Sequence, residues 1–322
     1  MMDFDASGLS SGYLEFHNST NVSAWQMLRV PVYCINGAPG PTTLVLGGMH
    51  GDEYEGPIAI QHLVQGTSPD DLVGRLILVP ALNLPAVQSG TRLSPEDGLN
   101  LNRVFPGDPQ GSLTQRIAHF ISETLIPLAD HVIDLHSGGR SLNFAPSVLL
   151  HEVEGPAMQK ALNAAKAFDA PFTVLLNEDH ADVMIDAIVE RAGKVMIATE
   201  LGGSGILTPT TAQIAKDGLK NCLTNLGHFD DLNQPEGTSC FVRFPESDTY
   251  LISDDTLLFE PLVELGRHVS KGDVIGLGHM VDRIDVAPVL FKAPQKGWFV
   301  CTAGQGLVHR GDVVAIVARE VE

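Results

Sequence analysis

The stretch TTLVLGGMHGDEYEGPIAIQHLV, residues 42–64, decides the fold. It begins with an apolar run at 43–46, passes through a glycine-rich turn, and continues over 56–64 with apolar residues at helical spacing. A buried strand that leads through a tight turn into a helix is the repeating unit of α/β proteins.

The same alternation continues through the first two-thirds of the chain. Further strands are predicted at 75–79, 131–135, 172–176 and 195–199, and further helices at 113–125, 156–168, 182–192 and 211–226. Strands that are apolar throughout are typical of sheets covered on both faces. The pattern therefore predicts an α/β fold with a mostly parallel or mixed sheet flanked by helices.

The pattern changes after Asn233. Residues 234–237 read as a linker, and the chain beyond them is strand-like and rich in glycine. Two G-x-x-V-x-x-G-D-like turns, at 266–273 and 306–312, resemble the barrel-sandwich fold of biotinyl and lipoyl domains, but the hairpin lysine that carries those groups is absent. We therefore expect a catalytic domain over 1–233 and a small β domain over 234–322 that packs against the site or shapes it.

Composition narrows the possible partners. The 322 residues include 39 acidic and 20 basic side chains, which gives a net charge of −19. Nucleic acids and anionic membranes both require clustered Lys and Arg, so neither is an expected partner. No apolar run approaches the roughly 20 residues that span a bilayer, and the first residues lack the pattern of a secretory leader. We expect a soluble protein of the cytoplasm that acts on a small molecule.

A metal site is the sharpest chemical signal. His50 and Glu53 lie three residues apart in the glycine-rich turn, and an imidazole with a carboxylate is a donor set that suits zinc. His136 is the best third ligand, because it ends the strand at 131–135, where ligands of open α/β sheets gather. Asp134 could orient a ligand from the same side of that strand. Two histidines and one carboxylate leave a position for water, as in catalytic zinc sites.

Glu200 is the candidate general base. It follows the strongly apolar strand at 195–199, and burial of a carboxylate there would raise its pKa toward the range that suits proton transfer. A solvated loop acid is the alternative interpretation.

At these residues the sequence resembles a known family. The H-x-x-E turn, the Asn-Arg pair at 102–103 and the D-x-H strand end look like the zinc-dependent succinylglutamate desuccinylase/aspartoacylase family, a relative of the M14 metallocarboxypeptidases. The resemblance covers about residues 40–230, and a β tail is also typical of the family. Residues 51–57, 94–103 and 199–203 look most like the ectoine-degradation branch, which deacetylates Nα-acetyl-2,4-diaminobutyrate.

The resemblance implies a zinc-carboxypeptidase-like fold and a role for each candidate residue. It makes His50, Glu53 and His136 the ligands of one Zn²⁺ per subunit. It makes Asn102 and Arg103 the clamp for the substrate carboxylate, Arg92 the group that polarises the scissile carbonyl, and Glu200 the base. The implied reaction is hydrolysis of the amide bond of a small N-acyl amino acid, and we expect a homo-oligomer.

Other functions remain open at this point. They are a deacylase for a different acyl amino acid, a metallocarboxypeptidase, and a zinc-binding scaffold without catalysis. Carboxypeptidases usually place a pocket tyrosine shortly before the catalytic glutamate, and this chain has no tyrosine between Tyr54 and Glu200, which favours a deacylase. Five polar residues of expected loops are further candidates for lining the pocket: His151, Glu178, Asp179, His180 and Asp182.

Overall fold

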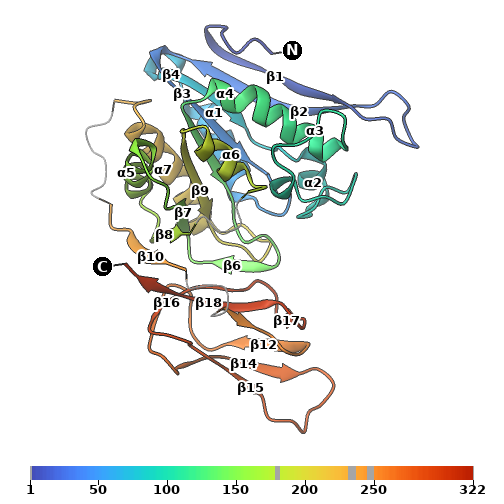
Figure 1. Ribbon diagram of the computed structural model, residues 1–322, viewed down its shortest axis with the longest axis vertical. Coiled ribbons are helices and arrows are strands. Elements are labelled where there is room, and N and C mark those ends of the chain that lie inside the picture. Colours follow the sequence, from blue (N-terminus) through green and yellow to red (C-terminus); the bar gives the residue numbers. More distant parts are fainter. Residues whose placement is uncertain (1, 178–181, 231–236, 245–249, 322) are drawn as a thin grey trace.

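The computed structural model describes residues 2–177, 182–230, 237–244 and 250–321. An α/β body carries the N-terminus, and a β-rich part at the other end of the long axis carries the C-terminus (Figure 1). The elements of the body are β1 (Gly8–His17), β2 (Met27–Asn36), β3 (Ala38–Gly47), α1 (Glu55–Gly66), β4 (Val73–Val79), α2 (Leu84–Ser89), α3 (Leu113–Phe120), α4 (Ile126–Leu128), β5 (His131–Leu135), β6 (Leu142–Phe144), β7 (Ser147–His151), α5 (Pro156–Phe168), β8 (Phe172–Leu176), α6 (Ile185–Arg191), β9 (Val195–Glu200) and α7 (Pro209–Asn225). Two 3-10 turns lie at Pro69–Asp71 and Leu101–Arg103, and a π-helical turn at Ile121–Leu125 joins α3 to α4.

A large mixed sheet organises the body, where its strand order is β1-β2-β4-β3-β5-β9-β7-β8. Its centre is a parallel block, in which β3 pairs with β4 and β5, and β5 pairs with β9. The five strands predicted from apolar runs are β3, β4, β5, β8 and β9, so the predicted α/β fold with a mixed sheet is confirmed. Because β3, β5 and β9 are parallel neighbours, their carboxyl ends meet at one edge of the sheet.

Four strands of the body, β1, β2, β6 and β7, have no counterpart in the sequence-based prediction. β1 and β2 form a long antiparallel hairpin at the end of the sheet, and β7 pairs antiparallel with β9. Along β1, exposed residues alternate with more buried ones, because its outer position leaves one side in solvent. A continuous apolar run, the signal of the buried strands, is therefore missing from β1.

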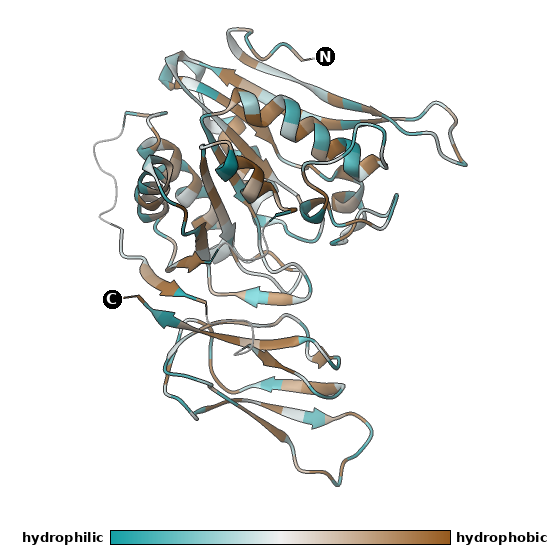
Figure 2. Ribbon diagram, in the orientation of Figure 1, coloured by the Kyte–Doolittle hydropathy of each residue, from teal (hydrophilic) through white to brown (hydrophobic). Residues whose placement is uncertain are grey.

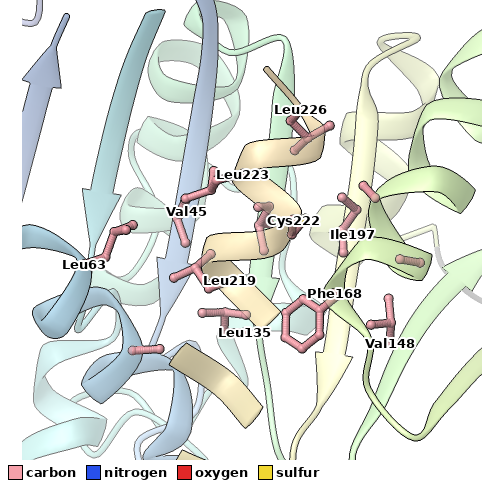
Figure 3. Close-up of a cluster of buried hydrophobic side chains, with 14 of the residues drawn as sticks. Val45, Leu63, Leu135, Val148, Phe168, Ile197, Leu219, Cys222, Leu223 and Leu226 are labelled. Atoms are coloured by element: carbon pink, nitrogen blue, oxygen red, sulfur yellow. The ribbon is translucent and has the colours of Figure 1, made fainter. Parts of the chain in front are cut away.

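Helices cover both faces of the central strands. Val45 of β3 packs with Leu219 and Leu223 of α7 in one core cluster, which also includes residues of α1 and α5 (Figure 3). Leu44 and Leu46 point the other way and pack with residues of α3. Successive side chains of a strand face opposite sides, so burial on both faces requires the unbroken apolar run from which β3 was predicted. Figure 2 shows the apolar residues concentrated on these inner strands.

Over residues 237–244 and 250–321, the described C-terminal part consists of strands and connecting loops, as predicted. It contains β10 (Cys240–Arg243), β11 (Leu251–Ile252), β12 (Leu257–Pro261), β13 (His268–Val269), β14 (Val274–Met280), β15 (Val289–Lys292), β16 (Gly297–Ala303), β17 (Leu307–Val308) and β18 (Val313–Glu320). A four-stranded sheet of order β15-β14-β12-β17 is separate from the large sheet. The two repeated turns have the same geometry, because Asp273 accepts a hydrogen bond from the Ser270 N–H and Asp312 accepts one from the His309 N–H, both at 2.8 Å.

The large sheet continues from the body into the C-terminal part. β10 pairs with β8 of the body on one side and with β18 on the other, and β6 pairs with β16. The predicted boundary between 233 and 234 lies outside the described residues, as does most of the predicted linker. Among the described residues, no helix has both the length and the apolar character needed to cross a membrane.

A buried histidine pair lies at the opposite edge of the parallel block from the candidate site. Nδ1 of His228 donates to the Val73 carbonyl oxygen at 2.8 Å, so its Nε2, 2.6 Å from Thr43 Oγ1, accepts the hydroxyl proton. His131 Nδ1 can then donate to Thr43 Oγ1 at 3.0 Å. His228 is thus held in its neutral form, and a neutral His131 ring can make its contact with Thr43. Burial and the neighbouring His228 lower the pKa of His131 from 6.5 to about 4.

This pair predicts a loss of stability in mild acid. The unfolded chain binds a proton at His131 below about pH 6.5, whereas the folded chain binds it only near pH 4. The contribution of His131 to the free energy of unfolding is therefore complete above pH 6.5 and is lost as the pH falls toward 4. We expect on the order of 2 kcal/mol from this residue. His131→Asn keeps a donor for Thr43 without a titrating ring. Urea unfolding of the chelator-treated protein between pH 7.5 and 4.5 should show a shallower pH dependence for this variant; identical slopes would contradict the assignment.

Candidate metal centre and active site

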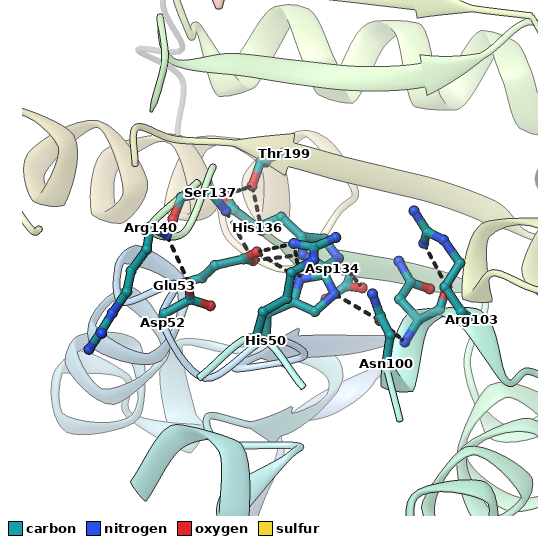
Figure 4. A network of polar contacts seen from close by, with 12 residues as sticks. His50, Asp52, Glu53, Asn100, Arg103, Asp134, His136, Ser137, Arg140 and Thr199 are labelled. Carbon is teal, nitrogen blue, oxygen red and sulfur yellow. Dashed lines mark hydrogen bonds and ion pairs between the residues drawn. The ribbon is translucent and has the colours of Figure 1, made fainter. Parts of the chain in front are cut away.

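The three candidate ligands converge on one point. His50 and Glu53 lie in the turn between β3 and α1, and His136 follows β5 directly (Figure 4). Glu53 Oε1 is 2.7 Å from His50 Nδ1, and Glu53 Oε2 is 2.8 Å from His136 Nδ1. One ligand atom from each residue lies within 4.8 Å of the other two, and all three side chains are buried. The structure thus brings together the His-Glu-His set that the sequence pointed to.

Close backbone packing positions the two loops that carry these ligands. A Cβ at Gly51 would lie 1.9 Å from the carbonyl carbon of Ala86, so only glycine lets the His50 turn pack against α2. Asp52 Oδ2 accepts a hydrogen bond from the Arg140 N–H at 2.8 Å, and the carboxylate fills the space beside Gly139, which has a positive φ of 55°. The turn after β3 therefore braces the loop after β5.

The outer nitrogens of both rings are held as donors. His50 Nε2 donates to Asn100 Oδ1 at 3.0 Å, and His136 Nε2 donates to Asp134 Oδ2 at 2.9 Å. The Asn100 oxygen also accepts the Asn102 N–H at 2.9 Å, which fixes the orientation of its amide. With Nε2 as the donor, the Nδ1 of each ring faces an oxygen of Glu53, so either a proton or a metal cation must lie between them. The donor set and its surroundings therefore fit a zinc site.

The contacts between Glu53 and the two histidines shift the pKa values of these groups. Burial acts to raise the pKa of Glu53, but the adjacent His50 and His136 hold it well below its usual range. Burial acts to lower the pKa of His136, yet the charges of Asp134 and Glu53 raise it well above its usual value. Glu53 also accepts the Ser137 N–H at 3.2 Å. The carboxylate of Glu53 is thus ionised, and the cluster is built to hold positive charge beside it.

Glu200 is the last residue of β9, next to β5 in the sheet, and lines the same pocket as His50 and His136. Its Oε2 is buried and has no hydrogen-bond partner in the described part of the chain. Burial, together with the negative charge of Glu53, raises its pKa from 4.5 to about 8. A carboxyl group with its pKa near neutrality, facing a metal-binding cluster, has the properties of a general base.

Three further candidates surround the pocket. Arg92 Nη1 lies 3.3 Å from His50 Nδ1 and 3.4 Å from Glu53 Oε1. Asn102 is buried, and its Oδ1 accepts the Ile185 N–H at 3.0 Å, so the amide ties the 3-10 turn to the start of α6. The exposed Arg103 donates to the Asn102 carbonyl oxygen at 2.8 Å and leaves other guanidinium donors toward the pocket.

The pocket also contains residues that sequence reasoning missed. Its lining comprises His50, Arg92, Asn102, Arg103, His136, Leu149, Leu150, His151, Leu176, Met184, Asp186, Glu190, Met196, Ala198, Thr199 and Glu200. Asp186 and Glu190 belong to α6, and nothing in the local sequence separates them from ordinary solvent-facing helix acids. Of the five loop candidates, His151 lines the pocket, the side chain of Asp182 is 90% exposed and does not line it, and Glu178, Asp179 and His180 lie outside the described residues.

Comparison with known proteins gives the same answer along the whole chain. The profile of the "Succinylglutamate desuccinylase/Aspartoacylase catalytic domain" matches residues 39–226, more than half of the sequence. The N-alpha-acetyl-L-2,4-diaminobutyric acid deacetylase of Halomonas elongata is 41% identical over 323 residues, which cover 100% of this chain and 94% of the relative.

The chain belongs to the succinylglutamate desuccinylase/aspartoacylase family. Two solved structures of similar proteins agree with this membership over nearly the full length. A succinylglutamate desuccinylase from Silicibacter sp. TM1040 has a TM-score of 0.95 and 38% identity, covering 99% of this chain and 97% of its own. The product-bound ectoine utilization protein EutE (DoeB) from Ruegeria pomeroyi has a TM-score of 0.94 and 41% identity over the same shares. The resemblance read from the sequence is confirmed, and the protein is a deacylase of this family.

The cluster generates a prediction about metal content. His136→Ala removes one of three ligands and should lower bound zinc severalfold, as measured by elemental analysis of protein purified with zinc and then desalted. His62→Ala is the matched control, because His62 is an exposed residue of α1 away from the cluster and should leave the metal content unchanged. Full zinc occupancy in His136→Ala would refute its role as a ligand.

Proposed function

We propose that this protein hydrolyses the amide bond of Nα-acetyl-2,4-diaminobutyrate, releasing acetate and 2,4-diaminobutyrate, with one Zn²⁺ per subunit held by His50, Glu53 and His136. The observation that carries the proposal is that His50 and His136, which cluster with Glu53, line one pocket together with Glu200 and the Asn102–Arg103 pair. The 41% identity to a deacetylase of this substrate, over the whole chain, supports the choice of acyl amino acid.

Glu200 acts as the proton carrier in this reaction. When bound, zinc supplies Lewis acidity toward the scissile carbonyl and the attacking water. Glu200 takes the proton of that water and passes it to the leaving amine, so that the amine departs in neutral form. The unpartnered Oε2 of Glu200 leaves one oxygen free for this transfer. A cation beside Glu53 offsets the charge that helps to raise the pKa of Glu200, so the working pKa lies below about 8.

The arginines position the substrate and stabilise charge. The planar guanidinium of Arg103 suits bidentate binding of the amino-acid carboxylate, and the amide of Asn102 lies beside it. Arg92, above the ligand cluster, supplies a donor to the oxygen that becomes negative during attack. Substrate binding through its carboxylate then places the acyl carbon near the metal and Glu200, which makes the attack effectively intramolecular.

We also infer the wider organisation of the protein. The catalytic part spans 1–233 and the C-terminal part 234–322, and the chain works as a homo-oligomer in the cytoplasm. These remain predictions, to be checked by limited proteolysis for the boundary, by light scattering for the subunit number and by fractionation for the location.

A substrate panel tests the proposed function. Zinc-loaded protein is assayed with Nα-acetyl-2,4-diaminobutyrate, acetyl-aspartate, succinyl-glutamate and a C-terminal dipeptide, following release of the free amine. We expect the highest kcat/KM with acetyl-diaminobutyrate and no release from the dipeptide. A higher kcat/KM for acetyl-aspartate or succinyl-glutamate would assign a different deacylase activity, and cleavage of the dipeptide would assign a carboxypeptidase.

Glu200→Gln should keep zinc but lose hydrolysis. Removal of a general base costs about 10²–10⁴-fold in rate, while none of the three ligands is altered. The wild-type kcat/KM should fall as the pH drops below the pKa of Glu200, because only the ionised carboxylate accepts a proton, and this acid limb should be absent from the residual activity of the variant. Wild-type turnover in Glu200→Gln would refute its assignment as base.

A further inference from the structure

One wall of the pocket is acidic, and the proposed reaction does not use it. Asp186 and Glu190 lie four residues apart on α6, which places both on the same face of the helix, and both line the pocket together with Arg103 and Glu200. Asp186 is only 8% exposed. In the described part of the chain no group donates a hydrogen bond to its carboxylate, whose oxygens open to the pocket. A carboxylate on a largely buried side chain that opens only to the pocket is available to a positively charged ligand there.

The two acids differ in how they are held. Glu190 is engaged by His151, whose Nδ1 lies 3.0 Å from Oε1 and 3.2 Å from Oε2. Asp186 has no hydrogen bond of this kind; burial raises the pKa of its carboxyl group, the charge of His151 acts to lower it, and the charges of Asp134 and Glu190 raise it further. Of the two acids in this wall, Asp186 is therefore the one left available to a positively charged ligand.

The acidic wall lies beside the proposed carboxylate clamp. The N–H of Ile185, the residue before Asp186, donates to Asn102 Oδ1 at 3.0 Å, so the start of α6 is fixed directly to the clamp. The charge of Asp186 also acts on Arg103. Much of the remaining wall is apolar, with Leu149, Leu176, Met184 and Met196. The pocket thus offers a cation for a carboxylate, an apolar surface for a short stem, and an anion for the end of that stem.

We propose that Asp186, backed by Glu190, binds the side-chain ammonium of the substrate and selects N-acyl diamino acids over neutral and anionic acyl amino acids. The inference rests on the proposed function and specifies how that site chooses its substrate. The negative charge of this wall attracts the ammonium of a diamino acid and repels the second carboxylate of an acidic one. Both effects favour the N-acyl diamino acid as substrate.

Three matched substrates test this role. Acetyl-norvaline replaces the ammonium of acetyl-diaminobutyrate by a methyl group, and acetyl-glutamate replaces it by a carboxylate. Asp186→Asn keeps the shape of the side chain but removes its charge. We expect kcat/KM for acetyl-diaminobutyrate to fall about 10- to 100-fold, mainly through KM, because a charged hydrogen bond is lost. The value for acetyl-norvaline should stay within about twofold.

Asp182→Asn is the control for charge alone. Asp182 precedes the same helix, is ion-paired with Arg191, and does not line the pocket. This variant should keep the wild-type ratio between the two substrates. If Asp186→Asn lowers both substrates equally, or leaves their ratio unchanged, Asp186 has only a structural role and the inference is wrong.

A binding measurement separates this inference from the proposed function. Calorimetry with 2,4-diaminobutyrate and with norvaline needs no turnover. Tighter binding of the diamino acid to the wild type, lost in Asp186→Asn, would support the acidic wall even if no acyl substrate were hydrolysed, and only the proposed function would then fail. Equal binding of both amino acids to the wild type would overturn the inference, whatever the activity.

Discussion

The carboxylate of Glu53 imposes the constraint on which the site depends. Its side chain is 2% exposed and lies between two imidazoles at the edge of the core. A buried charge is tolerated only when charges and hydrogen bonds of good geometry surround it. His50, His136 and the Ser137 N–H supply that surrounding, and Asp134 and Asn100 orient the two rings. The loops that carry these residues must therefore hold them at hydrogen-bonding distance from Glu53 and from the two rings.

The sheet meets this requirement through strand order. β3, β5 and β9 are parallel neighbours, so the Glu53 turn, His136 and Glu200 leave the sheet at one edge. The loops after β5 and β9 are also joined, since the Gly138 and Phe144 N–H groups both donate to the Gly202 carbonyl oxygen at 3.0 Å. β6 then pairs with β16 of the C-terminal part. In the described chain no residue lining this pocket comes from beyond β9, so the C-terminal part meets the loops of the site through strand pairing and supplies none of these side chains.

The sequence predicted what depends on local pattern. Fully apolar strands such as β5 and glycine-flanked ligands such as His50 carry their signal in consecutive residues. β1 carries a weaker signal, because its half-exposed position replaces the apolar run by alternation. Asn100 and Asp186 carry no such signal in the sequence. Asn100 has its role because it contacts His50, and Asp186 because it lines the pocket. Such contacts arise only when distant segments of the chain pack together.

Local charge, rather than the net charge of −19, governs what the pocket can select. Charges on the surface are screened over about 8 Å at physiological salt, whereas buried groups act through a medium of low dielectric constant. Within the pocket, Arg92 and Arg103 oppose Asp186 and Glu190. This separation of signs favours a molecule with a carboxylate at one end and an ammonium at the other. An acyl amino acid with two carboxylates would satisfy the arginines but leave the buried Asp186 facing a like charge, and a neutral side chain would leave it unpaired.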